Sequence, residues 1–144
     1  MARRSVWGWG FEGDELDAET VGGLAAHLGF GRSDVEDPVA PQLAAPRIGI
    51  PPELRDCASA DDYDRARHGL GSSYMDTVRG LRGTYAHAPD FVVHAWTEDH
   101  VQRALEWAVG KGVSVTPVGG GTSVVGGIEA HALGNGAIAL VLTA

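Results

Sequence analysis

The chain has 144 residues, a mass of 15.0 kDa and a formal net charge of −8 at pH 7. This length is typical of one modest domain and excludes a large multidomain assembly within these residues. An acidic surface repels nucleic-acid backbones and anionic lipid headgroups, so we expect neither as a partner. The 21 glycines are about twice the usual share and follow no regular period, which indicates that some of them serve backbone geometry.

The only cysteine, Cys57, has no partner for an internal disulfide, which favours a reducing compartment. The N-terminus is basic, but the Trp- and Gly-containing residues 5–10 follow where a signal peptide would need an apolar run. No stretch approaches about eighteen uninterrupted apolar residues, so we expect no transmembrane segment. These observations predict a cytoplasmic protein.

Composition divides the chain near residue 84. Residues 1–84 carry nine of the 11 basic and 14 of the 19 acidic side chains, whereas residues 85–144 are rich in Val, Ala and Gly. In the first region, residues 17–28 predict a short amphipathic helix that ends at Gly29 and Gly31, and the proline-rich residues 36–52 predict an extended connector. We interpret the Arg65 and Arg67 segment as a solvated basic patch, with an anionic substrate of the parent enzyme as the alternative partner of these arginines. The first region is therefore expected to be helical and irregular.

The second region predicts alternating strands and one helix. Residues 91–95 and 113–116 are expected strands, and the helix between them is expected to begin after Thr97 and to be stopped by Gly110 and Gly112. Its apolar stripe comprises Val101, Ala104, Leu105 and Ala108. Residues 137–142 predict a third strand. A strand, helix and strand in this order normally place both strands parallel in one sheet, so the predicted fold class is α+β with a small parallel β-α-β sheet.

The glycine-rich residues 117–127 directly follow the second predicted strand, where α/β sheets commonly bind ligands. Consecutive glycines allow several backbone N–H groups to face one point, an arrangement that suits phosphate oxygens. The sequence lacks the lysine of a Walker A loop and the third glycine of a Rossmann loop, so neither ATP nor NAD is indicated. From glycine content alone, a plain turn between strands explains the segment equally well.

Three segments carry a resemblance to a known family. Residues 89–93, 97–105 and 113–123 resemble, in order, spacing and residue type, the start of the FAD-binding domain of the vanillyl-alcohol oxidase and p-cresol methylhydroxylase (PCMH) family. Upstream, residues 5–10, 46–50 and 67–80 resemble the N-terminal region of the alkyldihydroxyacetonephosphate synthase subgroup. The resemblance divides the chain into an N-terminal helical and Pro-rich region, 1–84, and the first part of a PCMH-type FAD-binding domain, 85–144.

The resemblance implies that a glycine-rich loop binds the pyrophosphate of FAD. Its residues would be Pro117, Val118, Gly119, Gly120, Gly121, Thr122 and Ser123. Gly121 or Thr122 stands where some family members carry a flavin-linking histidine, so the FAD is expected to be non-covalent. The implied function is that of the cofactor-holding segment of an FAD-dependent oxidoreductase. The alternatives are a glycolate or D-lactate type 2-hydroxy-acid oxidase, or a truncated non-catalytic fragment.

The resemblance also implies that this chain is an N-terminal fragment. Family members are longer, and their catalytic residues and the cap domain that binds a small-molecule substrate lie beyond residue 144. We therefore expect the 144 residues alone to be inactive and the full-length parent to be capable of forming a homodimer. Six histidines show no metal-binding spacing, so no metal site is predicted. Trp7 and Trp9 are expected either to dock a partner or to anchor on the chain itself.

Overall fold

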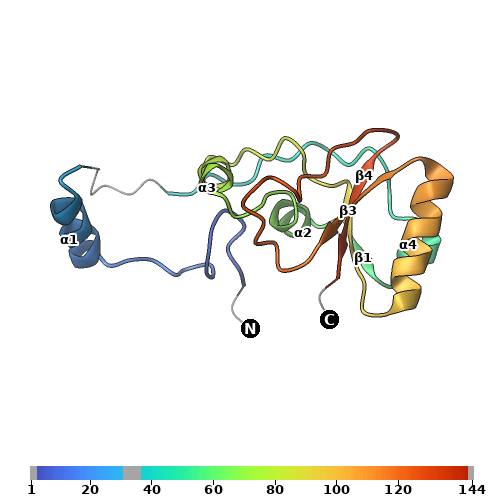
Figure 1. Ribbon diagram of the computed structural model, residues 1–144, viewed down its shortest axis with the longest axis horizontal. Coiled ribbons are helices and arrows are strands. Elements are labelled where there is room, and N and C mark those ends of the chain that lie inside the picture. Colours follow the sequence, from blue (N-terminus) through green and yellow to red (C-terminus); the bar gives the residue numbers. More distant parts are fainter. Residues whose placement is uncertain (1–2, 31–36, 143–144) are drawn as a thin grey trace.

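The computed structural model describes residues 3–30 and 37–142 (Figure 1). Its helices are α1 (Ala18–Leu28), α2 (Asp62–Arg67), α3 (Tyr74–Leu81) and α4 (Glu98–Lys111), with a short 3-10 helix η1 at Pro52–Leu54. Its strands are β1 (Ala58–Ser59), β2 (Phe91–His94), β3 (Ser114–Val118) and β4 (Ala137–Val141). Gly31, predicted as part of the end of α1, and residue 36, predicted as the start of the connector, lie outside the described residues.

The sheet has four strands in the order β1-β2-β4-β3. Strands β2, β4 and β3 are parallel, which confirms the predicted α+β class with a small parallel sheet. The two strands joined by α4 are not neighbours, because β4 lies between them and pairs Ile138 with both Phe91 and Val115. The short β1 pairs antiparallel with β2, an addition that the sequence did not predict.

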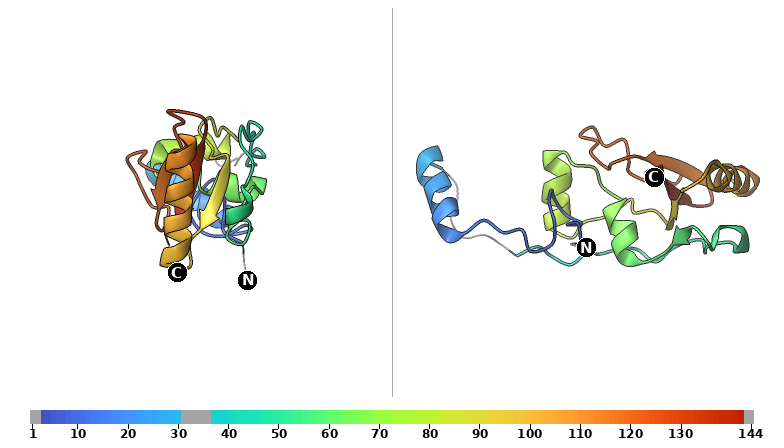
Figure 2. Two further views of the ribbon diagram at one scale, coloured as in Figure 1. Left: turned by 90° about the vertical axis from the view of Figure 1, so that its right-hand side faces the viewer. Right: turned by 90° about the horizontal axis from the view of Figure 1, so that it is seen from below.

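Alternating side chains give the sheet two apolar faces. Phe91 and Val93 of β2 pack in the same cluster as Ala104 and Ala108 of α4, whereas Val92 packs in a second cluster. The second cluster also contains Ile128, from the long loop between β3 and β4. Helix α4 therefore covers one face of the sheet (Figure 2, left), and loop residues help to cover the other.

The boundaries of α4 are set by capping residues. The Thr97 hydroxyl accepts a hydrogen bond from the N–H of His100, and Gly112 ends the helix with φ of 64°. Gly110 lies inside the helix, so the prediction that it helps to stop α4 was wrong. Leu105 was expected in the apolar stripe but is 43 % exposed, because it lies at the outer edge of the buried stripe formed by Ala104 and Ala108.

The predicted N-terminal helix is confirmed as α1, but its apolar face does not pack against the rest of the protein. The Asp17 carboxylate caps its N-terminus, and Gly29 ends it in the left-handed conformation. None of its residues is buried, and the helix lies apart from the sheet in Figure 1 and in the right-hand view of Figure 2. None of the described helices is long and apolar enough to cross a membrane.

Residues from the first region contribute directly to the core. Leu54 of η1 and Cys57 are buried in the cluster that contains Phe91. The buried Asp90 carboxylate accepts hydrogen bonds from the Arg47 side chain and backbone and, at 2.8 Å, from the N–H of Ala137. Asp90 thus joins the extended connector to the starts of β2 and β4.

The tryptophans behave differently from one another. A Cβ on Gly80 of α3 would stand 2.8 Å from the Cα of Trp7, so the Trp7 backbone lies directly on that helix. Trp9 is 65 % exposed. Trp107 packs against Phe91, with 5.6 Å between ring centroids. The contact at Gly80 favours anchoring of Trp7 on the chain itself.

Candidate functional site

The glycine-rich loop leaves the sheet at the carboxyl end of its parallel strands. Pro117 and Val118 lie in β3, and the Val118 side chain is buried beneath the loop. Gly119 and Gly120 are exposed, whereas Gly121 is buried and has φ of 71°. This φ lies in the region that glycine adopts without steric cost. The loop therefore turns sharply at Gly121 directly above the buried end of the strand.

The backbone amides of the loop are available to a ligand. Within the described residues, the N–H groups of residues 119–125 donate no hydrogen bond to the protein. A Cβ on Gly119 would meet nothing within 4 Å, and one on Gly120 would meet only the Thr122 methyl at 3.8 Å. The surface above these glycines is therefore open. Successive free amides with open space above them form an arrangement suited to anionic oxygens.

The segment after α2 holds the loop in place. The Ser72 N–H donates to the Ser123 carbonyl at 2.7 Å, and the Ser72 hydroxyl donates to the Gly121 carbonyl at 3.0 Å. The Ser123 hydroxyl accepts from the N–H of Gly127 at 3.2 Å. The two contacts from Ser72 use loop carbonyls, and the amides of residues 119–125 stay unused. They fix the loop conformation before any ligand binds.

A second tie joins α3 to the far end of the same loop. The Arg79 guanidinium pairs with Asp76 of its own helix and with Glu129, at 2.7 Å to Oε1. Burial opposes ionisation of Asp76, but hydrogen bonds from Ser73 and Arg79 outweigh it and keep its pKa below the usual value. The ionised pair therefore anchors residues that follow the glycine loop.

A pocket of about 350 Å³ lies beside the glycines. Gly119, Gly120, Gly121 and Val141 line it from the sheet, and Arg4, Tyr63, Arg67 and His68 line it from the first region. Of the predicted site residues, the three glycines therefore line the pocket, while Pro117, Val118, Thr122 and Ser123 do not. The structure also brings in arginines that the loop sequence alone did not indicate.

Arg65 and Arg67 do not form the solvated patch that the sequence suggested. Arg65 is 3 % exposed, and its guanidinium donates to the carbonyls of Pro89 and Ala44 and pairs with Asp62. Arg67 is half-buried and faces the glycine loop. The prediction was wrong because these contacts come from residues remote in sequence, which local charge patterning does not report.

Two histidines lie next to Asp64, and one of them, His68, lines the pocket. His68 Nδ1 donates to the Asp64 carbonyl at 2.9 Å, and His94 Nε2 lies 3.4 Å from Asp64 Oδ2. The contact with His94 lowers the pKa of Asp64, whereas burial lowers the pKa of His68. A lowered pKa favours neutral His68 at neutral pH.

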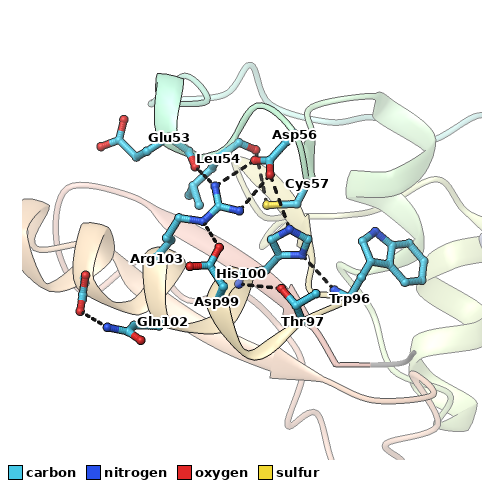
Figure 3. Close-up of polar contacts among 11 residues, drawn as sticks. Glu53, Leu54, Asp56, Cys57, Trp96, Thr97, Asp99, His100, Gln102 and Arg103 are labelled. Carbon is cyan, nitrogen blue, oxygen red and sulfur yellow. Dashed lines mark hydrogen bonds and ion pairs between the residues drawn. The ribbon is translucent and has the colours of Figure 1, made fainter.

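Within the part of the chain that the structure describes, two groups of side chains could offer ligands to a metal ion: Asp56, Cys57 and His100; and His87, Glu129 and His131. In the first group, Arg103 already pairs with Asp56 (Figure 3), and burial raises the pKa of the Cys57 thiol. In the second group, Arg79 occupies both Glu129 oxygens. Each carboxylate is thus already bonded to a guanidinium, which opposes the binding of a cation.

The region that contains the loop is similar to a known protein family. A family model described as an FAD binding domain matches residues 89–144, from the turn before β2 through the loop to β4. Residues 89–144 are thus similar to an FAD-binding domain. The match confirms the expected PCMH-type, FAD-binding character of this region.

Two individual relatives support the match to an FAD-binding domain. Alkyldihydroxyacetonephosphate synthase of Dictyostelium discoideum is 34 % identical over 80 residues, and that of Trypanosoma brucei brucei is 38 % identical over 82 residues. These alignments cover 56 % and 54 % of this chain but only 12 % and 13 % of the relatives. The chain thus matches about one eighth of the length of these curated relatives.

Solved structures extend the similarity in fold. Two crystal forms of alkyldihydroxyacetonephosphate synthase superpose on this chain with TM-scores of 0.68 and 0.69 at 22 % sequence identity. The superpositions cover 94 % of this chain and 30 % or 31 % of the solved chains. The fold similarity therefore reaches beyond the FAD-binding domain into the first region.

Proposed function

We propose that the glycine-rich loop binds the diphosphate of FAD. In this proposal the N–H groups of Gly119, Gly120 and Gly121 donate to phosphate oxygens, and the hydroxyls of Thr122 and Ser123 add further donors. Pro117 and Val118 present the loop from the end of β3. The observation that carries the proposal is the run of loop amides, residues 119–125, that donate to nothing else in the described structure.

The residues around the loop fit the chemistry of a diphosphate. Exposed glycines without Cβ atoms allow the main chain to approach the ligand closely, and the adjoining pocket of about 350 Å³ is open to receive part of a large cofactor. The contacts from Ser72 hold the loop in one conformation. Preorganised donors lose little entropy on binding, which favours affinity.

The protein that carries this domain is, in our proposal, an FAD-dependent enzyme similar to alkyldihydroxyacetonephosphate synthase. Bound FAD would supply the redox chemistry of its isoalloxazine ring, and the residues described here would hold and orient it. Residues 119–127 contain no histidine, cysteine or tyrosine to attach a flavin covalently. We therefore propose that the FAD is dissociable.

Substitution of Gly120 tests the loop assignment. A valine at this position has room within the protein, so Gly120→Val should fold normally while its side chain enters the proposed diphosphate path. The expected result is loss of FAD from the full natural chain after gel filtration. Gly49→Val, at an exposed glycine with nothing within 4 Å of its Cβ position, is the matched control and should retain FAD. Retention of FAD at the wild-type level by Gly120→Val would overturn the assignment.

A further inference from the structure

The pocket beside the glycine loop contains a half-buried arginine with no protein partner in the described structure. Arg67 is the last residue of α2, and its Nη1 atom lies 3.1 Å from the point where a Cβ on Gly121 would stand. Within residues 3–30 and 37–142, the Arg67 guanidinium makes no hydrogen bond or ion pair. Its position places a free positive charge directly against the turn at Gly121.

Other arginines in the fold show how unusual this position is. Arg65, two residues earlier, donates to two carbonyls and pairs with Asp62. Arg79 and Arg103 each pair with two carboxylates. Arg67 is half-buried and lines the pocket without such partners, so its guanidinium is free to pair with an anionic ligand there.

A second arginine approaches the same pocket. Arg4 lines it, and its carbonyl accepts a hydrogen bond from the Tyr63 hydroxyl of α2 at 3.0 Å. Burial lowers the pKa of Arg67, and the nearby charge of Arg4 lowers it further. Two like charges thus lie near each other at one pocket, an arrangement that an anion between them would stabilise.

We propose that Arg67, together with Arg4, binds the FAD diphosphate in the pocket that these side chains share with Gly119–Gly121. This inference rests on the proposed function of the loop. It adds two residues that lie outside residues 89–144, the segment that the FAD-binding domain model matches. Guanidinium groups bind phosphate oxygens through two parallel hydrogen bonds, and two of them balance the two charges of a diphosphate. Local cations also offset the net charge of −8, which by itself repels such an anion. The N-terminal region thereby becomes part of the cofactor site.

The test is a titration of the full natural chain with FAD, in which binding is monitored by the quenching of flavin fluorescence. Arg67→Gln should raise the Kd for FAD about tenfold or more, whereas Arg67→Lys, which keeps the charge without the planar fork, should have a smaller effect. Arg55→Gln removes the same charge from an exposed position and should leave the Kd unchanged. Urea unfolding of each variant establishes that it is folded at the titration conditions.

Competition by inorganic pyrophosphate gives a second measurement. Pyrophosphate should displace FAD from the wild type, and Arg67→Gln should weaken this competition by a factor similar to its effect on FAD. A wild-type Kd in Arg67→Gln, with FAD lost in Gly120→Val, would overturn the role of Arg67 and leave the loop assignment intact. Wild-type binding in both variants would overturn both proposals. An equal rise of the Kd for FAD in Arg55→Gln would show that overall charge causes the effect, and would also overturn the role of Arg67.

Discussion

Gly71 lies so close to Ser123 that a Cβ on residue 71 would stand 2.3 Å from the Ser123 carbonyl oxygen. Real Cβ atoms do not approach an oxygen this closely, so residue 71 must be glycine for the segment after α2 to reach the loop. The adjacent Ser72 then makes two hydrogen bonds to loop carbonyls. The conformation of the proposed FAD site therefore depends on a residue some fifty positions earlier in the chain.

Gly71→Ala should separate this segment from the loop. Overpacking of this kind costs about 1–3 kcal/mol, and the free energy of unfolding in urea should fall by that amount. The affinity for FAD should fall as well, because the loop loses the contacts that fix it. Gly23→Ala, in exposed α1 with nothing within 4 Å of its Cβ position, is the control. Unchanged stability together with unchanged affinity in Gly71→Ala would contradict this account.

Asp90 should make stability depend on acid pH. Burial raises the pKa of this carboxyl, but hydrogen bonds from Arg47 and Ala137 outweigh that effect and hold the pKa below its usual value. Because the folded-state pKa is lowered, the stabilisation is fully present above the unfolded pKa of about 3.9 and is lost as pH falls through the lower folded value.

Asp90→Asn should therefore lower the free energy of unfolding by about 2–4 kcal/mol at pH 7, since it weakens a buried, hydrogen-bonded ion pair. The difference from wild type should shrink as the pH falls below about 4. Urea unfolding at a series of pH values measures both effects, with Glu15→Gln at an exposed position as the control. A difference that stays constant from neutral to strongly acidic pH would show that ionisation of Asp90 is not the cause.

Asp56 offers a spectroscopic test of the contact between η1 and α4. The Arg103 guanidinium bonds both Asp56 oxygens, at 3.0 and 2.9 Å, and lowers the pKa of Asp56 to about 2 (Figure 3). Arg103→Gln should return this pKa toward about 4, as followed by NMR titration of the carboxyl carbon. Arg82→Gln, at an exposed position, should leave it unchanged. A pKa that stays near 2 in Arg103→Gln would assign the shift to other groups.

Local signals in the sequence predicted the elements that local interactions determine. Thr97 and Gly112 bound α4 as expected, because a cap bonds to residues of its own first or last turn. The glycine loop was located for a similar reason, since its composition and its place after a strand are both local features. Its assignment as residues 117–123 of an FAD site stays a prediction, as does the domain boundary after residue 84.

Features that depend on distant pairing were not predicted. The insertion of β4 between β2 and β3 depends on which strand edges meet, and β1 is too short to show a pattern. Arg67 was interpreted from its charged neighbours, yet its position is decided by how α2 packs beside a loop about fifty residues later. The sequence around Arg67 contains no signal for that contact.

The most direct test of the account is the flavin content of the full natural chain. The protein should be incubated with FAD, separated by gel filtration, and measured by visible absorption before and after acid precipitation. We predict about one FAD per folded chain, released into the supernatant on precipitation because it is not covalently attached. A folded, monodisperse protein that elutes without flavin would contradict FAD binding, and flavin that remains in the precipitate would contradict dissociable binding.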